Sequence, residues 1–92
     1  MNIRFYFDEE LGMFHIYSHS VTEDEVEDIL TNPGEDRRGN EDSRVAIGQT
    51  SSGRYLKVIY VPDPKPDSVF VITAYELKGK PLSAYKKRRK KK

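Results

Sequence analysis

The leading candidates for proton transfer or phosphate binding in this sequence are His19, Arg54, Tyr75 and Lys80. An imidazole such as that of His19 titrates near neutrality and can serve as a general acid or base. Tyr75 ends a long apolar run and can donate a proton or stack on a nucleobase. Both have a structural alternative: His19 can pack beside a helix start and hydrogen-bond the backbone, and Tyr75 can pack a strand end against the last helix.

The other cationic candidates lie beside a glycine and within a predicted strand. Lys78 and Lys80 flank Gly79, whose flexibility lets two ammonium groups approach a phosphate closely. Arg54 follows a predicted turn and either clamps a phosphate with two hydrogen bonds or is an exposed turn residue. Lys57 contacts a phosphate if its strand face is open, and otherwise it extends from the sheet edge into water.

The C-terminal segment, residues 76–92, concentrates the positive charge. It contains nine of the sixteen basic residues and one acid, which leaves seven basic and fourteen acidic residues in the rest of the chain. Because such an acidic body repels a polyanion, we expect this segment to be held against RNA. Arg88 and Arg89 are its predicted RNA-binding arginines, and Tyr85 either stacks on a nucleobase or packs in the core. The terminal lysines give non-specific attraction, form a solubilising end, or bind an acidic partner.

Composition predicts one small polar domain over residues 1–92, with 34% charged residues and a mean hydropathy of -0.76. The absence of cysteine excludes a disulfide, a thiolate zinc site and a cysteine nucleophile. His15 and His19 are four residues apart, but no third ligand is evident, so we expect no metal and no cofactor. No run is long enough to span a membrane and the N-terminus lacks a signal peptide, which predicts a cytoplasmic protein.

Hydrophobic periodicity predicts the order strand, helix, helix, three strands, helix. This is an α+β protein with an antiparallel four-stranded sheet and helices on one side. Strands are expected over 3–7, 43–50, 54–61 and 69–75, helices over 9–18, 22–31 and from 81 onward, and a polar loop over 32–42. The clearest helix start is the capping box of Thr22 and Glu25, with Val21 and Val26 as a hydrophobic staple. The run 69–75 is the longest apolar one, so we expect a central strand covered on both faces.

Three segments together resemble the BrnT-type toxins of the RelE/ParE-like superfamily. They are His-Ile-x-x-His-Ser-Val-Thr-x-x-Glu-Val at 15–26, Gly-Gln-Thr-x-x-Gly-Arg at 48–54, and Ile-Thr-Ala-Tyr at 72–75 running into a basic helix. The resemblance spans roughly residues 3–89 and depends on the order and spacing of the segments. The family pattern usually has glycine where Ser20 stands and often has arginine where Tyr75 stands.

The resemblance implies a RelE/ParE-like fold and the toxin of a type II toxin–antitoxin pair. Such toxins are similar to metal-independent endoribonucleases that cleave mRNA and are neutralised by a small DNA-binding antitoxin. In that reaction the 2′-hydroxyl attacks the adjacent phosphodiester. The implied roles are phosphate binding by Lys78, Lys80, Arg54 and Arg88, and proton transfer by His19 or Tyr75.

Two other functions fit the same sequence. One is a non-catalytic nucleic-acid-binding or regulatory module of the same fold, which the missing strand arginine and the simple lysine tail favour. The other is a DNA-gyrase-directed toxin of the ParE kind, which would arrest growth and leave RNA intact.

Overall fold

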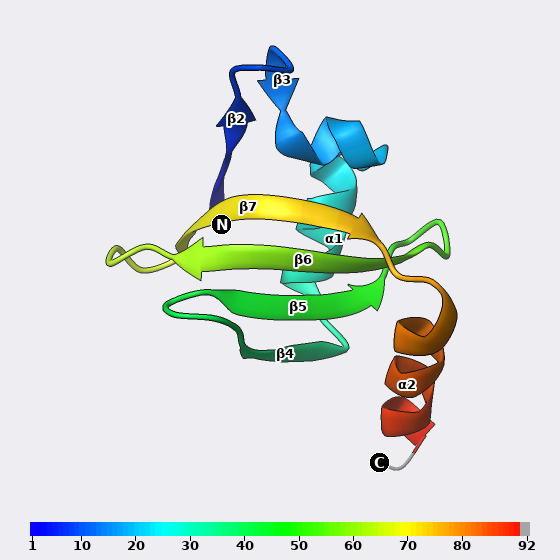
Figure 1. The fold of residues 1–92 in the computed structure, drawn as a ribbon. Helices are drawn as coiled ribbons and strands as arrows, with labels where there is room; N and C mark the ends of the chain where they lie inside the picture. Colours follow the sequence, from blue (N-terminus) through cyan, green and yellow to red (C-terminus); the bar gives the residue numbers. More distant parts are fainter. Residues whose placement is uncertain (91–92) are drawn as a thin grey trace.

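A mixed five-stranded sheet organises the computed structural model, which describes residues 1–90 (Figure 1). Its strands are β1 (Asn2–Phe5), β4 (Glu35–Arg38), β5 (Arg44–Gln49), β6 (Tyr55–Pro62) and β7 (Ser68–Glu76). They lie in the order β1-β7-β6-β5-β4, with β1 parallel to β7 and the other neighbours antiparallel. Lys91 and Lys92, the last lysines of the predicted basic segment, lie outside the described residues.

The expectation of four antiparallel strands is wrong, although the α+β class is confirmed. The additional strand is β4, which lies within the predicted polar loop 32–42. Its sequence, Glu-Asp-Arg-Arg, has no apolar alternation. It is held by backbone pairing with β5 and by Asp36, which accepts hydrogen bonds from Arg44 Nε (3.0 Å) and Tyr60 Oη (2.7 Å). β1 and β4 form opposite edges of the sheet, so the chain between them crosses one face.

The predicted helix over 9–18 is also wrong, because a small hairpin and a 3-10 helix occupy this segment. The elements are β2 (Phe7–Asp8), β3 (Met13–Phe14) and the 3-10 helix η1 (His15–His19). Asp8 does accept hydrogen bonds from the backbone N–H groups of Glu10 and Leu11, as a helix cap would. The turn ends at Gly12, whose φ of +71° reverses the chain.

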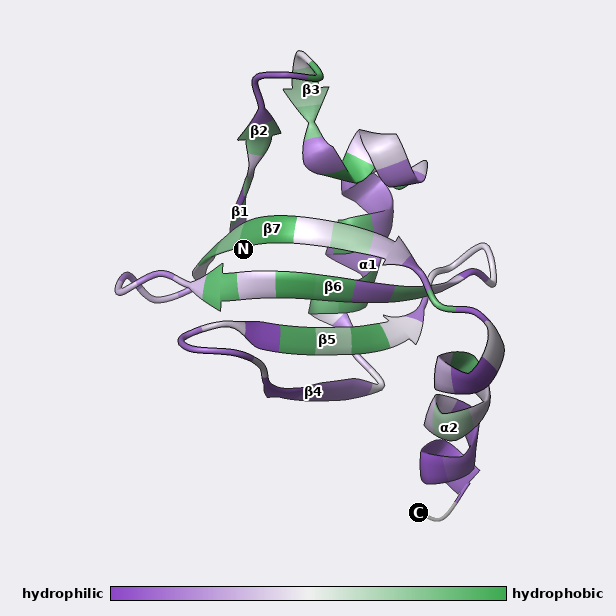
Figure 2. Cartoon of the chain, in the orientation of Figure 1, coloured by the Kyte–Doolittle hydropathy of each residue, from purple (hydrophilic) through white to green (hydrophobic). Residues whose placement is uncertain are grey.

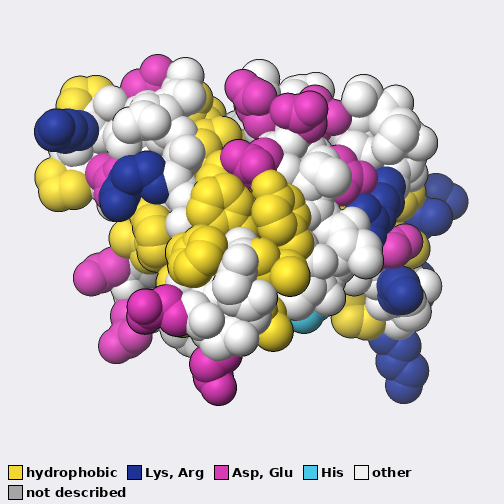
Figure 3. Space-filling view, turned by 90° about the horizontal axis from the view of Figure 1, so that it is seen from above, with side chains coloured by type: hydrophobic (Ala, Val, Ile, Leu, Met, Phe, Trp, Pro, Cys, Tyr) yellow, Lys and Arg dark blue, Asp and Glu magenta, His cyan; other side chains and the backbone are white. Residues whose placement is uncertain are grey.

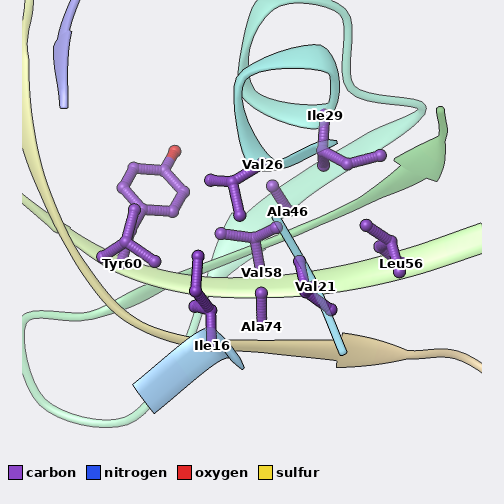
Figure 4. Packing of buried hydrophobic residues seen from close by; sticks show 10 residues of the cluster. Ile16, Val21, Val26, Ile29, Ala46, Leu56, Val58, Tyr60 and Ala74 are labelled. Atoms are coloured by element: carbon purple, nitrogen blue, oxygen red, sulfur yellow. The ribbon is translucent and has the colours of Figure 1, made fainter. Parts of the chain in front are cut away.

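Helix α1 (Glu23–Thr31) confirms the predicted capping box and packs behind the sheet in Figure 1. The Thr22 side chain accepts from Glu25 N–H, while the Glu25 carboxylate accepts from Thr22 N–H. Val21 and Val26 of the predicted staple are both buried in the core. The buried cluster in Figure 4 joins α1 and η1 to the facing side chains of the sheet: Ile16, Val21, Val26, Ile29, Ala46, Leu56, Val58, Tyr60, Val71 and Ala74. Burial of these apolar side chains is the main stabilising contribution to the fold.

The opposite sheet face, here called the open face, carries no helix over its centre (Figure 1). On β6, Tyr55, Lys57 and Ile59 point to this face because they alternate with the buried Leu56 and Val58. The adjacent strand β7 is interior to the sheet, as its apolar run predicts. Its expected cover on both faces is wrong, since five of its nine residues are only partly buried. The strands β5 to β7 are hydrophobic in Figure 2, whereas β4 is hydrophilic.

Helix α2 (Gly79–Lys90) leaves the sheet after β7 and has Pro81 in its first turn, as expected. It packs through Tyr85 and Leu82 against Ile47 and Tyr55, which forms a second small core. Its last turn is basic, and Figure 2 shows it becoming hydrophilic toward its end. Within residues 1–90, no helix combines the length and the apolar character needed to cross a membrane.

Candidate functional site

A shallow cleft of about 350 Å³ lies where η1 meets the ends of β6 and β7. Its lining residues are His19, Ser20, Arg54, Tyr75, Glu76 and Lys78. Four of the sequence-predicted residues, His19, Arg54, Tyr75 and Lys78, therefore come together here from three separate parts of the chain. The sheet register brings a fifth one close, because Lys57 of β6 pairs with Tyr75 of β7 on the open face.

Two imidazoles, a phenol ring and an ammonium group form a row along this cleft. The His15 and His19 ring centres are 5.1 Å apart, and the His19 and Tyr75 ring centres are 5.9 Å apart, both edge-to-face. Lys57 Nζ lies 5.9 Å from the centre of the Tyr75 ring. His19 and Tyr75, which line the cleft, thus have a second imidazole and an ammonium group as neighbours.

Asp8 contacts His15, the histidine at one end of this row. Its Oδ2 lies 3.1 Å from His15 Nδ1. The hydrogen bond from His15 keeps the pKa of Asp8 below its usual value, although partial burial opposes this shift. A carboxylate at Nδ1 favours the tautomer with a proton on that nitrogen, which leaves Nε2 of His15 as an acceptor. The sequence pattern missed this pair, because only the β2–β3 hairpin brings Asp8 beside a histidine seven residues later.

Arg54 is held by the protein itself. Its Nη1 donates to the Ser20 carbonyl (2.7 Å) and to both carboxylate oxygens of Glu25 (3.0 and 3.1 Å), and its Nε lies 3.5 Å from Glu76 Oε1. Burial acts to raise the pKa of Glu25, but hydrogen bonds from Thr22 and Arg54 outweigh it and keep that pKa below its ordinary value. The guanidinium therefore links the start of α1 to the ends of β6 and β7. In this arrangement Arg54 positions the wall of the cleft.

Ser20 supplies another part of that wall in a left-handed backbone conformation, with a φ of 59° at the end of η1. This conformation favours glycine. A glycine at this position would therefore adopt the same backbone conformation with less strain. The Ser20 carbonyl is also the acceptor for Arg54, so the local backbone and the ion-pair network depend on each other.

The remaining sequence-predicted residues lie on α2, apart from the cleft. Tyr85 is 4% exposed and packs against Tyr55 with ring centres 6.2 Å apart, which matches its core-packing alternative. Arg88 forms a double hydrogen bond with Glu35 (2.7 and 2.9 Å), and Arg89 donates to the Gly34 carbonyl (2.9 Å). These two arginines link α2 to the start of the edge strand β4. Lys80 is exposed in the first turn of α2 and does not line the cleft.

Beside α2 runs a larger groove of about 510 Å³, which the sequence pattern did not indicate. Its lining residues are Asn32, Pro33, Gly34, Gln49, Tyr55, Tyr85, Lys86, Arg89 and Lys90. Lys86 Nζ lies 5.0 Å above the Tyr55 ring. A Cβ at Gly34 would collide with the Tyr85 hydroxyl, so only glycine leaves room for that ring here. Tyr55 is two residues from Lys57 on the same strand face, so the groove adjoins the row of the cleft.

Among the described residues, no group of three or more His, Asp or Glu side chains is arranged to hold a metal ion. The site is thus a cleft with imidazole, phenol and ammonium groups in a small α+β domain. The model of one family, described as a domain of unknown function (DUF4258), matches residues 16–76. This is about two thirds of the chain, so the protein belongs to the DUF4258 family. Comparisons with curated proteins and with solved structures gave no match.

Proposed function

We propose that the protein is a metal-independent endoribonuclease that cleaves single-stranded RNA. The observation that carries this proposal is the position of His19, which lies between His15 and Tyr75 at the edge of the cleft. Cleavage needs a base, an acid and cations around one phosphate. Two imidazoles and a phenol supply the first two, and Lys57 and Lys78 supply positive charge.

The reaction proceeds by attack of the 2′-oxygen on the adjacent phosphorus. The 2′-hydroxyl proton passes to His19, the P–O5′ bond breaks, and the leaving 5′-oxygen takes a proton from Tyr75 or from a protonated His15. The products are a 2′,3′-cyclic phosphate and a 5′-hydroxyl, so atoms and charge balance without a metal ion. Lys57 and Lys78 stabilise the charge that develops on the phosphoryl oxygens. The charge of Arg54 is already balanced by Glu25 and Glu76. Arg54 helps to position His19 and Tyr75 by binding their chain neighbours, the Ser20 carbonyl and the Glu76 carboxylate.

Single-stranded RNA suits this surface because cations and aromatic rings alternate along it. Lys86 lies over Tyr55, Lys57 lies over Tyr75, and Tyr75 lies against His19. Unpaired bases stack on aromatic side chains while lysines follow the phosphates. A strand that enters the groove beside α2 would reach the cleft along the open face.

We further infer a cytoplasmic toxin of a two-gene toxin–antitoxin module, with a RelE/ParE-like fold and a small DNA-binding antitoxin as its partner. The support is the resemblance of segments 15–26, 48–54 and 72–75, together with the order of a first strand, a helical region, the antiparallel strands β4 to β7 and a C-terminal helix. Expression in bacteria tests this assignment. Growth arrest that a neighbouring short gene relieves is expected, whereas normal growth of cells that accumulate the folded protein would contradict the assignment.

The test of cleavage is incubation of the purified protein with end-labelled single-stranded RNA in EDTA. Fragments that end in cyclic phosphate are expected from the native protein. The rate of fragment formation should fall at least about a hundredfold in His19→Ala, since removing a general acid or base typically lowers the rate by that factor or more. Lys65→Ala, in the exposed turn between β6 and β7, is the matched control and should cleave normally. Binding without fragments would refute free ribonuclease activity.

The specific rival is a non-catalytic RNA-binding module of the same fold. It is favoured by the ion pairs of Arg54 with Glu25 and of Arg88 with Glu35, because two predicted phosphate-binding cations are already occupied. Salt-sensitive binding without fragments would identify this module. Inhibition of DNA supercoiling with intact RNA would instead identify a gyrase-directed toxin.

A further inference from the structure

Exposed hydrophobic side chains lie on the β2–β3 hairpin and η1, apart from α2, and one of them, Tyr6, lies beside His15 with ring centres 6.2 Å apart. These side chains are between 39% and 50% exposed: Tyr6, Phe7, Leu11, Met13 and Tyr17. With Met1, they account for all the large hydrophobic side chains classed as exposed within residues 1–90. Figure 3 looks down on this side of the molecule and shows hydrophobic side chains gathered at its centre. We call these five residues the hairpin patch.

The hairpin patch rests on the core through Phe14. The Phe14 ring lies 6.2 Å from that of Phe7 and 5.7 Å from that of Tyr17, and it stacks on Phe5 at 5.3 Å. Phe5 and Phe14 both pack against the main buried cluster. The patch is therefore a preformed surface whose rings are supported from below. Contiguous exposed apolar surface of this kind marks an interaction site in soluble proteins.

Carboxylates surround the hairpin patch. Residues 1–31 contain eight acidic residues and one basic residue, Arg4, which is paired with Asp63. Glu9 and Glu10 lie on the hairpin turn, and Glu23 accepts a hydrogen bond from the Tyr17 hydroxyl. Figure 3 shows acidic side chains on both sides of the hydrophobic centre, with Lys and Arg at the left and right ends of the view. An apolar centre with an acidic rim thus defines the chemistry of the occupant.

We propose that the hairpin patch docks a segment of another protein that has an apolar face flanked by lysine or arginine. Charge complementarity selects this occupant, because the carboxylates attract cations around an apolar contact. The same carboxylates repel RNA, an anionic membrane and the identical patch of a second copy. The hairpin patch shares no lining residue with the cleft or the groove, and its test measures peptide binding, so this inference does not depend on ribonuclease activity.

Model peptides test the proposal without a known partner. The probe is an amphipathic helical peptide of leucine and lysine, and its control is a peptide in which glutamate replaces every lysine. Binding is measured by calorimetry and mapped by amide chemical shifts on the full chain. We expect the Leu/Lys peptide to bind and to shift the resonances of the hairpin patch, while the Leu/Glu peptide does not bind. Equal binding of both peptides, or shifts confined to the open face or α2, would overturn the proposal.

Two double variants separate the apolar contribution to peptide binding from the electrostatic contribution. The double variant Phe7→Ser, Leu11→Ser should lower the affinity for the Leu/Lys peptide at least about tenfold, because a few apolar anchor residues supply most of the binding energy. The double variant Glu9→Lys, Glu10→Lys should lower the affinity for this peptide by a similar factor at low salt. The matched charge control is Glu41→Lys with Asp42→Lys, in the exposed loop between β4 and β5, which should change affinity less than about twofold. Equal losses from both charge variants, or dimerisation of the native chain through Phe7 and Leu11, would contradict the assigned occupant.

Discussion

His19 owes its position to residues that carry no chemistry of their own. The 3-10 helix η1 ends at His19, and the left-handed backbone of the next residue, Ser20, turns the chain toward α1. The same residue offers its carbonyl to Arg54, which also holds Glu25 and Glu76. The imidazole is thereby directed at Tyr75, across the cleft. Substitution of these supporting residues would therefore alter both the position of His19 and the lining of the cleft.

Ser20→Gly should stabilise the protein by about 0.5–1 kcal/mol, because the left-handed conformation disfavours a residue with a Cβ and suits glycine. The Ser20 carbonyl remains, so the hydrogen bond from Arg54 is kept. Chemical denaturation monitored by circular dichroism measures the change. Ser83→Gly, at an exposed position inside α2, is the control and should destabilise by roughly 0.5 kcal/mol. A loss of stability in Ser20→Gly would show that the serine side chain has a further role.

At the scale of the elements, Glu25 connects the start of α1 to β6. Glutamine at this position retains the capping box but removes the charge that Arg54 contacts. Glu25→Gln should therefore lower the free energy of unfolding at neutral pH by about 1 kcal/mol. Glu27→Gln, which is exposed on the same helix, is the control and should have little effect.

The same substitution has a predicted pH dependence. The pKa of Glu25 in the folded protein lies below its ordinary value of 4.5, since hydrogen bonds from Thr22 and Arg54 outweigh the effect of burial. Its contribution is thus present above pH 4.5 and is lost as the pH falls through the folded pKa. Native protein should lose more stability than Glu25→Gln on acidification below pH 4.5. Denaturation midpoints measured over a pH series test this difference, and parallel curves would contradict it.

Elements with strong local signals were predictable, and elements held by tertiary pairing were not. The capping box of Thr22 and Glu25 located α1, alternating apolar residues located β5 and β6, and a continuous apolar run located β7. In contrast, β4 contains four charged residues and forms only because β5 offers it a free edge. The segment 9–18 has apolar residues at helical spacing, yet Gly12 and the Asp8 turn convert it into a hairpin. Periodicity alone does not resolve such competition.

The candidate site divides in the same way. His19, Arg54 and Tyr75 were singled out by residue type, and the sheet register brings them to one cleft. Asp8 was recognised only as a cap, because its contact with His15 depends on the hairpin. Tyr85 sits in the small core, and Arg88 is paired with Glu35, a residue of the strand that was not predicted. Assigning partners to charged side chains therefore required the fold.

At the scale of the whole molecule, positive charge is separated from an acidic body. Nine basic residues and one acid occupy 76–92, whereas residues 1–75 have seven basic and fourteen acidic residues. The hairpin patch lies within the acidic part, while the groove and α2 form the cationic part. The hairpin patch and the groove thus share no residue and differ in the sign of the charge around them.

This charge separation makes a quantitative prediction for RNA affinity. If Lys57, Lys78, Lys86 and Lys90 each contact a phosphate, the slope of log K against log salt should be near -3, because each contact on a single strand contributes about -0.7. Each single Lys→Ala substitution should reduce the magnitude of that slope by about 0.7, and Lys65→Ala should leave it unchanged. Fluorescence anisotropy with a labelled RNA over a salt series measures the slopes. If only Lys86→Ala and Lys90→Ala changed the slope, RNA would be held by α2 alone, and the cleft would not lie on its path.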